Sequence, residues 1–311
     1  MNKLDIQFAP MQGQTDAIYR RLHQQAFGGV SAYYTPFIRL EKGALRKRDR
    51  RELLPEAKGE EVVIPQLMAR DPQELRTLLE QVSSRRIDLN LGCPFPKQVR
   101  AHYGSGLWPY PDEVKALLDS LAAYPDRVFS LKIRLGLHDV EEVLSLVPYL
   151  NTLPVHQITV HPRLGIQQYK GTVDLEAFAR FSEACTLPLY YSGDLMTLED
   201  LDRIQVRFPT VAGVLWGRGL LAHPWLANVY TTEIAWDALR KRTVCEQFHA
   251  DLLAAYSERL EGGNHQIVKK MKEIWTYFLP EGDPKGRKKI KKSHSLASYE
   301  EGVACVMEKM L

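Results

Sequence analysis

The chain has 311 residues, of which 45% are hydrophobic and 25% are charged, and its formal net charge at pH 7 is +3. This length is too great for a small disulfide scaffold and leaves room for one large barrel or two domains of ordinary globular composition. No run approaches 18 uninterrupted apolar residues and residues 1–10 lack the features of a secretory signal, so we expect a cytoplasmic protein without a membrane segment.

Eight mostly continuous apolar runs predict strands that are buried on both faces, as in a parallel sheet. They cover residues 6–11, 32–39, 62–67, 87–91, 128–134, 157–161, 187–192 and 213–216. Segments of helical period lie between them at residues 72–82, 112–122, 140–149, 175–185 and 198–208. Strands that alternate with helices predict a (β/α)8 TIM barrel. An open doubly wound sheet is disfavoured because no G-x-G-x-x-G turn follows the first strand.

From residue 235 the helical period continues without strands. It covers residues 236–260, 265–278 and 295–310, and residues 280–292, rich in Gly, Pro and Lys, predict a linker before the last helix. We therefore expect a barrel domain over residues 1–234 and a C-terminal helical domain over residues 235–311.

Two segments of the chain are strongly basic. Residues 39–51 carry seven basic residues against two acidic ones, and six of the eight residues in 285–292 are basic. One such run alone is most simply a solvated loop. Two runs in a nearly neutral chain favour a polyanion as partner, because each could neutralise several phosphates.

Polar side chains recur where the predicted strands end, which is the end of a TIM barrel that carries the active site. They are Gln66, Asn90 and Cys93, Lys132 and Arg134, His161 and Arg163, Ser192-Gly193-Asp194, and Gly217-Arg218-Gly219. The first strand ends in the apolar Ala9-Pro10-Met11. The last two turns follow the seventh and eighth strands. Together they predict a bound phosphate, because glycine lets backbone N–H groups approach it and arginine adds a forked contact.

Cys93 lies between Gly92 and Pro94 at the end of a predicted strand. Lone thiols are usually small buried hydrophobes, and this interpretation suits Cys185, Cys245 and Cys305, which form no C-x-x-C pair and predict neither metal site nor disulfides. Cys93 could instead be a nucleophile, a metal ligand or a proton donor. Lys132 has two open interpretations as well, an ion pair with a carboxylate such as Asp88 or a contact to an electron-rich cofactor.

In order and spacing, several motifs resemble the tRNA-dihydrouridine synthases. They are Ala9-Pro10-Met11-Gln12-Gly13-Gln14-Thr15-Asp16, Gln66-Leu67, Asn90-Leu91-Gly92-Cys93-Pro94, Leu131-Lys132-Ile133-Arg134-Leu135-Gly136, His161-Pro162-Arg163, Gln168-Tyr169-Lys170-Gly171, Ser192-Gly193-Asp194, and Gly217-Arg218-Gly219 with Pro224-Trp225. Two departures concern the site. Ser192 stands where the family usually has asparagine, and the loop from Tyr103 to Trp108 is bulkier than the family's glycine-rich loop.

The resemblance implies an enzyme that uses FMN and NADPH to reduce a uridine flipped out of tRNA. For the oligomeric state, a monomer is the simpler expectation. Pro10, Met11 and Gln12 would lie against the flavin, Gln66 and Lys132 would bind its ring, and His161, Ser192, Gly193, Asp194, Gly217 and Arg218 would hold its phosphate end. Asn90, Arg134 and Arg163 would bind the uracil, and Cys93 would protonate C5. Two alternatives remain open: a flavin-dependent barrel reductase of a small pyrimidine or enone, and an RNA-binding protein without turnover.

Overall fold

The computed structural model describes residues 3–53 and 62–310 and divides the chain into two compact units. The barrel unit comprises Met1–Pro10, Ser31–Leu195 and Glu199–Trp216, and the helical unit comprises Met11–Val30, Met196–Leu198 and Gly217–Leu311. Residues 1–2, 54–61 and 311, which the predicted domains include, lie outside the described residues. The domain boundary at residues 234 and 235 stays a prediction.

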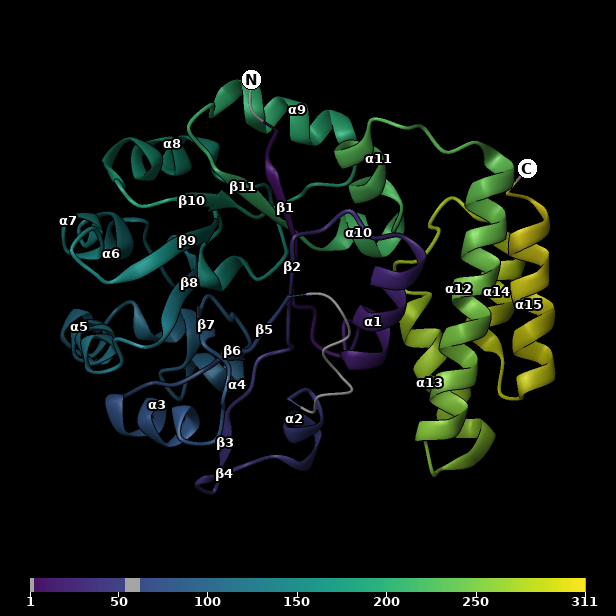
Figure 1. Cartoon of the computed structure of the whole chain (residues 1–311), viewed down its shortest axis with the longest axis horizontal. Helices are drawn as coiled ribbons and strands as arrows, with labels where there is room; N and C mark the ends of the chain where they lie inside the picture. The colour runs from purple at the N-terminus through teal and green to yellow at the C-terminus, as the bar shows by residue number, and fades with distance from the viewer. Residues whose placement is uncertain (1–2, 54–61, 311) are drawn as a thin grey trace. The chain divides into compact units, whose positions relative to one another are not determined.

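The barrel unit is built on a parallel sheet in the strand order β5-β2-β1-β11-β10-β9-β8-β7-β6. The strands are β1 (Asp5–Phe8), β2 (Ala32–Tyr34), β5 (Val63–Ile64), β6 (Gln66–Leu67), β7 (Arg86–Leu91), β8 (Val128–Arg134), β9 (Val155–His161), β10 (Leu189–Tyr191) and β11 (Gly213–Trp216). Helices lie around the outside of these strands (Figure 1). They include α3 (Pro72–Leu79), α5 (Pro111–Asp119), α8 (Leu175–Ala184) and α9 (Leu198–Arg207).

The two outermost strands of this order, β5 and β6, are consecutive in the chain and separated only by Pro65. The N–H of Thr35 donates to the carbonyl of Ile64 at 3.1 Å, and the N–H of Asp88 donates to the carbonyl of Pro65 at 2.9 Å. The segment from Val63 to Leu67 therefore pairs on both sides and brings the two edges of the sheet together, which confirms the predicted TIM-barrel architecture.

All eight predicted strands are present, with local differences that have simple causes. The run 62–67 is two strands because proline has no N–H to donate to a ladder. The predicted helix over 140–149 is two short helices, α6 (Glu141–Leu144) and α7 (Val147–Leu150), since Pro148 interrupts the hydrogen bonds between them. The basic segment 39–51 holds a hairpin, β3 (Leu40–Glu41) with β4 (Ala44–Leu45), and the short helix α2 (Lys47–Arg51).

Short helical turns complete the barrel unit near its strand ends. They are α4 (Pro96–Val99) and the 3-10 turns Gly104–Leu107, Ser120–Ala123 and Gly165–Gln167. Ser120–Ala123 falls largely within the helix predicted over 112–122. The sequence predicted none of the others, because three or four residues are too few to show a helical period.

The helical unit contains the long helices expected after residue 235 together with shorter ones. They are α1 (Ala17–Ala26), α10 (Arg218–Ala222), α11 (Leu226–Thr232), α12 (Ala238–Arg259), α13 (Gly263–Ile274), α14 (Pro284–Lys292) and α15 (Leu296–Glu308). Helix α1 packs on α12, and α14 lies alongside α15 (Figure 1). Within the described residues no helix is both long and apolar enough to cross a membrane.

The prediction of a linker over 280–292 is wrong, because Pro284–Lys292 forms α14. Asp283 caps this helix, with its Oδ2 accepting from the N–H of Gly286 at 2.7 Å, and Pro284 occupies the first turn. Ile290 is buried, and Gly302 of α15 lets it approach closely, since a Cβ on Gly302 would lie 2.9 Å from Ile290. A good cap and one buried face are enough to form a helix from a highly charged segment.

Candidate active site

The backbone of Cys93 is held from both sides at the end of β7. The Oδ1 of Asn90 accepts from the N–H groups of Gly92 at 3.1 Å and of Cys93 at 2.9 Å. On the other side, the N–H and the hydroxyl of Ser105 both donate to the carbonyl of Cys93 at 3.1 Å. Cys93 is only 6% exposed, and these hydrogen bonds fix the backbone of the turn that carries its buried thiol.

The loop from Tyr103 to Trp108 forms the second wall of this turn. Gly104 adopts the left-handed conformation with φ +58°, and a Cβ there would lie 2.7 Å from the Cys93 backbone and Cβ. The indole N–H of Trp108 donates to the carbonyl of Leu91 at 2.7 Å, and Tyr103 packs with Met68 against the thiol. The sequence showed this loop only as a bulky departure, whereas its tryptophan and glycine stabilise the turn that carries Cys93.

The surroundings of Cys93 keep its thiol protonated. Burial raises the pKa of Cys93 above its ordinary value of 9.0, and it outweighs the opposing effects of a hydrogen bond from Phe95 and of the charges on Arg134 and Lys132. A protonated thiol is a poor nucleophile and a possible acid. The geometry therefore favours the proton-donor interpretation over the nucleophile.

Lys132 lies next to Asn90 in the strand register and is partly buried. Burial and, to a smaller extent, the charge of Arg134 lower its pKa to about 8, against the opposing charge of Asp88. Among residues 3–53 and 62–310 its ammonium group has no hydrogen bond or ion pair, so the direct pair with Asp88 does not form. An ammonium group with three unused donors at a strand end can bind an anionic or electron-rich ligand.

Arg163 is the centre of a second cluster and is only 2% exposed. Its two terminal nitrogens donate to the carboxylate of Asp194 at 2.9 and 2.5 Å, and one of them also donates to the carbonyl of Gly171 at 2.6 Å. The other lies 3.2 Å from Nε2 of His161, which must accept because a guanidinium group only donates. The Nε–H of Arg163 is buried without a partner in the described part of the chain.

Arg134 connects the two clusters. It pairs with His161 in the strand register, donates to the carbonyl of Leu164 at 3.0 Å, and places its guanidinium group 5.4 Å from the ring centre of Tyr169. Burial lowers its pKa to about 10, so it remains charged at pH 7. Ser192, which follows β10, is buried near the same strand ends, and Gly193 and Asp194 come after it.

The remaining predicted residues fall at the boundary of the units or in the helical unit. Pro10 is partly buried and ends the first segment of the barrel unit, and the N–H of Met11 donates to the hydroxyl of Thr15 at 2.9 Å. Gln12 is exposed, and Gly217 and Arg218 begin α10. Whether Met11, Gln12, Gly217 and Arg218 meet the barrel residues at one ligand stays a prediction.

Two hydrogen bonds fix the loop that carries Met11 and Gln12 within the helical unit. The carboxylate of Asp16 accepts from the hydroxyl of Tyr256 at 2.8 Å, and Lys270 donates to the carbonyl of Gly13 at 2.8 Å while pairing with Asp16 at 3.1 Å. Tyr256 and Lys270 belong to α12 and α13. No sequence signal pointed to these contacts, because more than 200 residues separate the partners in the chain.

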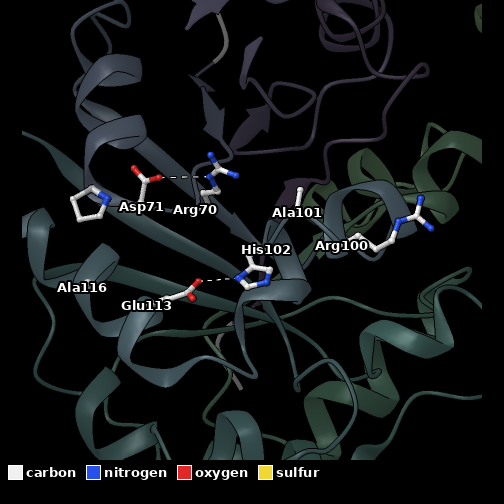
Figure 2. A pocket seen from close by; sticks show the side chains of 8 residues that line it. Arg70, Asp71, Arg100, Ala101, His102, Glu113 and Ala116 are labelled. Carbon is white, nitrogen blue, oxygen red and sulfur yellow. Dashed lines mark hydrogen bonds and ion pairs between the residues drawn. The ribbon is translucent and has the colours of Figure 1, made fainter. Parts of the chain in front are cut away.

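A surface cavity of about 540 Å³ lies elsewhere on the barrel unit and contains none of the predicted site residues. Figure 2 shows two pairs in its lining, His102 with Glu113 at 3.0 Å and Arg70 with Asp71 at 3.6 Å. Arg100 also lines the cavity. Over the described residues, no group of three or more His, Cys, Asp or Glu side chains is placed to hold a metal ion.

Comparison with known proteins relates the chain to one family. Residues 7–297 match the model of the family described as dihydrouridine synthase (Dus). The chain is 27% identical over 243 residues to tRNA-dihydrouridine synthase B of Pasteurella multocida, a match that covers 75% of this chain and 71% of the relative. It is 30% identical over 235 residues to tRNA-dihydrouridine(16) synthase of Ralstonia nicotianae, with 70% of each chain covered.

A solved structure with a similar fold is the old yellow enzyme of Trypanosoma cruzi. Its TM-score is 0.52 at 10% identity, and the match covers 75% of this chain and 89% of that chain. At this identity the likeness concerns the fold alone, and it agrees with the barrel described above.

The turn that carries Cys93 gives a direct test of the packing against Gly104. We expect Gly104→Ala to destabilise the protein by about 2–4 kcal/mol, because the new methyl group would meet the Cys93 backbone and the residue would keep a left-handed φ. Gly43→Ala is the matched control, since Gly43 also has a left-handed φ, +78°, but nothing within 4 Å of its added Cβ. Gly43→Ala should lower the free energy of unfolding, measured by urea denaturation, by only about 1–2 kcal/mol. Equal losses for the two variants would contradict the close contact.

Proposed function

The chain belongs to the dihydrouridine synthase family, and on this premise we propose that it reduces the C5–C6 double bond of uridines in tRNA, with FMN as cofactor and NADPH as reductant. The observation that carries the proposal is the buried, protonated thiol of Cys93 next to the strand-end side chains of Asn90 and Lys132. A small-molecule reductase would share the barrel but would have no use for the basic helix α14.

The donors at the strand ends fit an electron-rich cofactor. The Lys132 ammonium group is without a partner in the described residues, and Gln66 uses only one of its two N–H groups, in the hydrogen bond to Asp88 at 2.7 Å. Both are free to donate to the polar edge of a flavin ring. When bound, reduced FMN would supply a hydride to C6 of the uracil.

Cys93 is proposed to hold the proton that C5 of the uracil receives. Asn90 uses its oxygen in the turn and one N–H in the hydrogen bond to Gln66, and it has one N–H left, which could bind a uracil carbonyl. Arg134 would supply a permanent positive charge beside the substrate. These roles need Cys93 protonated and Lys132 and Arg134 charged, which is the state that their pKa values favour at pH 7.

The second cluster supports a modified role for Asp194. Its carboxylate is engaged by both terminal nitrogens of Arg163, and a carboxylate would repel a phosphate. We propose that Asp194 orients Arg163, whose Nε–H has no partner in the described residues and would be left for the ligand. Ser192, Gly193 and His161, with Gly217 and Arg218, remain the groups proposed for the phosphate end.

The helical part of the chain, residues 235–311, is proposed to bind tRNA through the exposed lysines of α14. Lys288 and Lys291 line a cavity of about 420 Å³ together with Lys272 and Trp275. Two other basic residues of α14 have structural roles: Arg287 donates to the carbonyls of Trp275, Phe278 and Leu279, and Lys289 pairs with Glu301. A surface of unpaired lysines fits a phosphate backbone, which is recognised by shape and charge.

The first experiment tests Cys93 as the proton donor. We expect Cys93→Ala to lower dihydrouridine formation by about 100-fold or more, because the proton for C5 loses its donor. The measurement is mass spectrometry of tRNA transcripts after incubation with FMN-loaded protein and NADPH. Cys185→Ala is the matched control, since Cys185 is a partly buried thiol at the end of α8, and it should keep full activity. Equal turnover by Cys93→Ala and the wild type would remove Cys93 from the reaction. Reduction of free uridine as fast as tRNA would favour the small-molecule alternative.

The pH dependence should show which group sets the alkaline limit. Lys132 must be charged and Cys93 protonated, so activity should hold at pH 7 and fall as pH rises through the Lys132 pKa of about 8. In Lys132→Arg the guanidinium group stays charged, and the fall should move to higher pH, toward the raised pKa of Cys93. The measurement is kcat/KM for tRNA between about pH 6 and pH 10. An alkaline limit that does not move in Lys132→Arg would assign it to another group.

The tRNA surface can be tested by charge removal. We expect the double variant Lys288→Ala with Lys291→Ala to weaken tRNA binding about tenfold and to reduce the slope of log Kd against log salt by about one to two. Lys289→Ala is the control for Lys288→Ala and Lys291→Ala taken singly, because each loses one positive charge but Lys289 pairs with Glu301, and its effect on the slope should be smaller than that of either. The slopes would come from filter binding at several salt concentrations. Identical slopes for the double variant and the wild type would place the RNA elsewhere.

A further inference from the structure

Asp88 is a buried carboxylate that the proposed reaction leaves without a role. It lies in the middle of β7, is 1% exposed, and pairs in the strand register with Gln66 on one side and Ser130 on the other. Its two oxygens accept from the hydroxyl of Ser130 at 2.6 Å and from the Nε2 of Gln66 at 2.7 Å. A buried carboxylate is costly unless it is well hydrogen-bonded, so its presence in a barrel interior requires an explanation.

The hydrogen bonds of Asp88 continue toward Cys93 without a break. Because the NH2 group of Gln66 faces Asp88, its carbonyl oxygen faces Asn90 and accepts from Nδ2 at 2.7 Å. The oxygen of Asn90 is then left to accept from the N–H groups of Gly92 and Cys93. A chain of two side-chain amides thus joins the carboxylate to the backbone of the thiol-bearing turn.

The groups at both ends of this series of hydrogen bonds require the same orientation of the two amides. Backbone N–H groups only donate, so the turn requires the oxygen of Asn90. Burial raises the pKa of Asp88 to about 7, and the hydrogen bonds from Ser130 and Gln66 oppose this rise. The ionised form of Asp88, which prevails above that pKa, only accepts and so requires the NH2 group of Gln66. Rotation of either amide by half a turn would bring two donors or two acceptors together. With no acceptor at position 88, the NH2 group of Gln66 would lose its partner, and the amide that accepts from Nδ2 of Asn90 would be held on one side only.

We propose that Asp88 is a positioning residue that orients the amides of Gln66 and Asn90 and, through them, the turn that holds Cys93. The inference rests on the proposed function, which gives Gln66 to the flavin, Asn90 to the uracil and Cys93 to the proton. It adds a residue that touches none of these ligands and acts through the side chains that do.

Asp88→Leu tests the proposal in the full-length protein. The substitution removes the acceptor at position 88, so the turn should loosen and the buried thiol should become reachable. We expect alkylation of Cys93 by iodoacetamide, followed on the Cys93 peptide by mass spectrometry, to become about tenfold faster than in the wild type. FMN affinity, measured by flavin fluorescence quenching without tRNA, should fall by a similar factor because Gln66 no longer presents its second N–H.

Gln157→Leu is the matched control for loss of a buried polar group. Gln157 lies in the same barrel unit and bonds to Gln7 and Tyr34, with Nε2 distances of 3.1 Å to each, but it has no link to the turn. It should lower the melting temperature as Asp88→Leu does and leave both the alkylation rate of Cys93 and the FMN affinity within about twofold of the wild type. Equal effects of the two variants on these readouts would reduce Asp88 to a structural residue and overturn the proposal.

Two further variants keep the test decisive. Asp88→Asn can still accept from Gln66 with its oxygen while its NH2 group donates to Ser130, so the alkylation rate should stay within about twofold of the wild type. If Asp88→Leu does not fold, Gln66→Met removes the middle link and should give the same faster alkylation. If Cys93 in Gln66→Met were alkylated as slowly as in the wild type, the proposal would be overturned.

Neither readout requires turnover, which separates this inference from the proposed function. A wild type that binds FMN but leaves tRNA unreduced would contradict the proposed function alone. A wild type that reduces tRNA, with Asp88→Leu indistinguishable from Gln157→Leu in alkylation and FMN affinity, would contradict the role of Asp88 alone.

Discussion

The candidate site depends on one constraint, the closure of the barrel by the segment from Val63 to Leu67. This segment forms hydrogen bonds to the strands on both of its sides. They bring the two edges of the parallel sheet together, and they do so with a segment that Pro65 divides into two short strands. Gln66 is one residue beyond that division and pairs with Asp88 in the register. The pairing of β6 with β7 places the Gln66 amide beside the Asn90 amide to which it bonds, and the closure keeps Gln66 from lying at an open edge.

The barrel interior contains two buried hydrogen-bond networks. They consist of similar side chains, but they differ in what they hold in place. Gln7, Tyr34 and Gln157 bond to one another and satisfy their own polar atoms. Asp88, Gln66 and Asn90 also satisfy one another, but their chain ends on the backbone of Cys93. Buried polar networks cost stability relative to an apolar core and give a unique arrangement in return. In this barrel the second network holds the turn that carries Cys93, the proposed proton donor, in one conformation.

The sequence predicted the barrel well because its signals are local. A parallel strand buried on both faces is a continuous apolar run, and all eight runs became strands. The position of Cys93 at a strand end was visible for the same reason. The pairing of Arg163 with Asp194, 31 residues apart, was not visible, and the two had been given separate roles. Helix α14 was missed because its stability comes from the Asp283 cap and from the packing of Ile290 on α15, whereas its composition is that of a solvated loop.

The basic residues of α14 show why composition alone is a weak guide to an interaction surface. Arg287 closes the end of α13 by donating to three carbonyls, and Lys289 pairs with Glu301 of α15, so both charges stabilise the helical unit. Lys285, Lys288, Lys291 and Lys292 are exposed and, within the described residues, have no ion pair. Only these lysines can release counterions to a polyanion without breaking an internal contact. The same helix therefore separates charges that stabilise the fold from charges that remain available to a phosphate backbone.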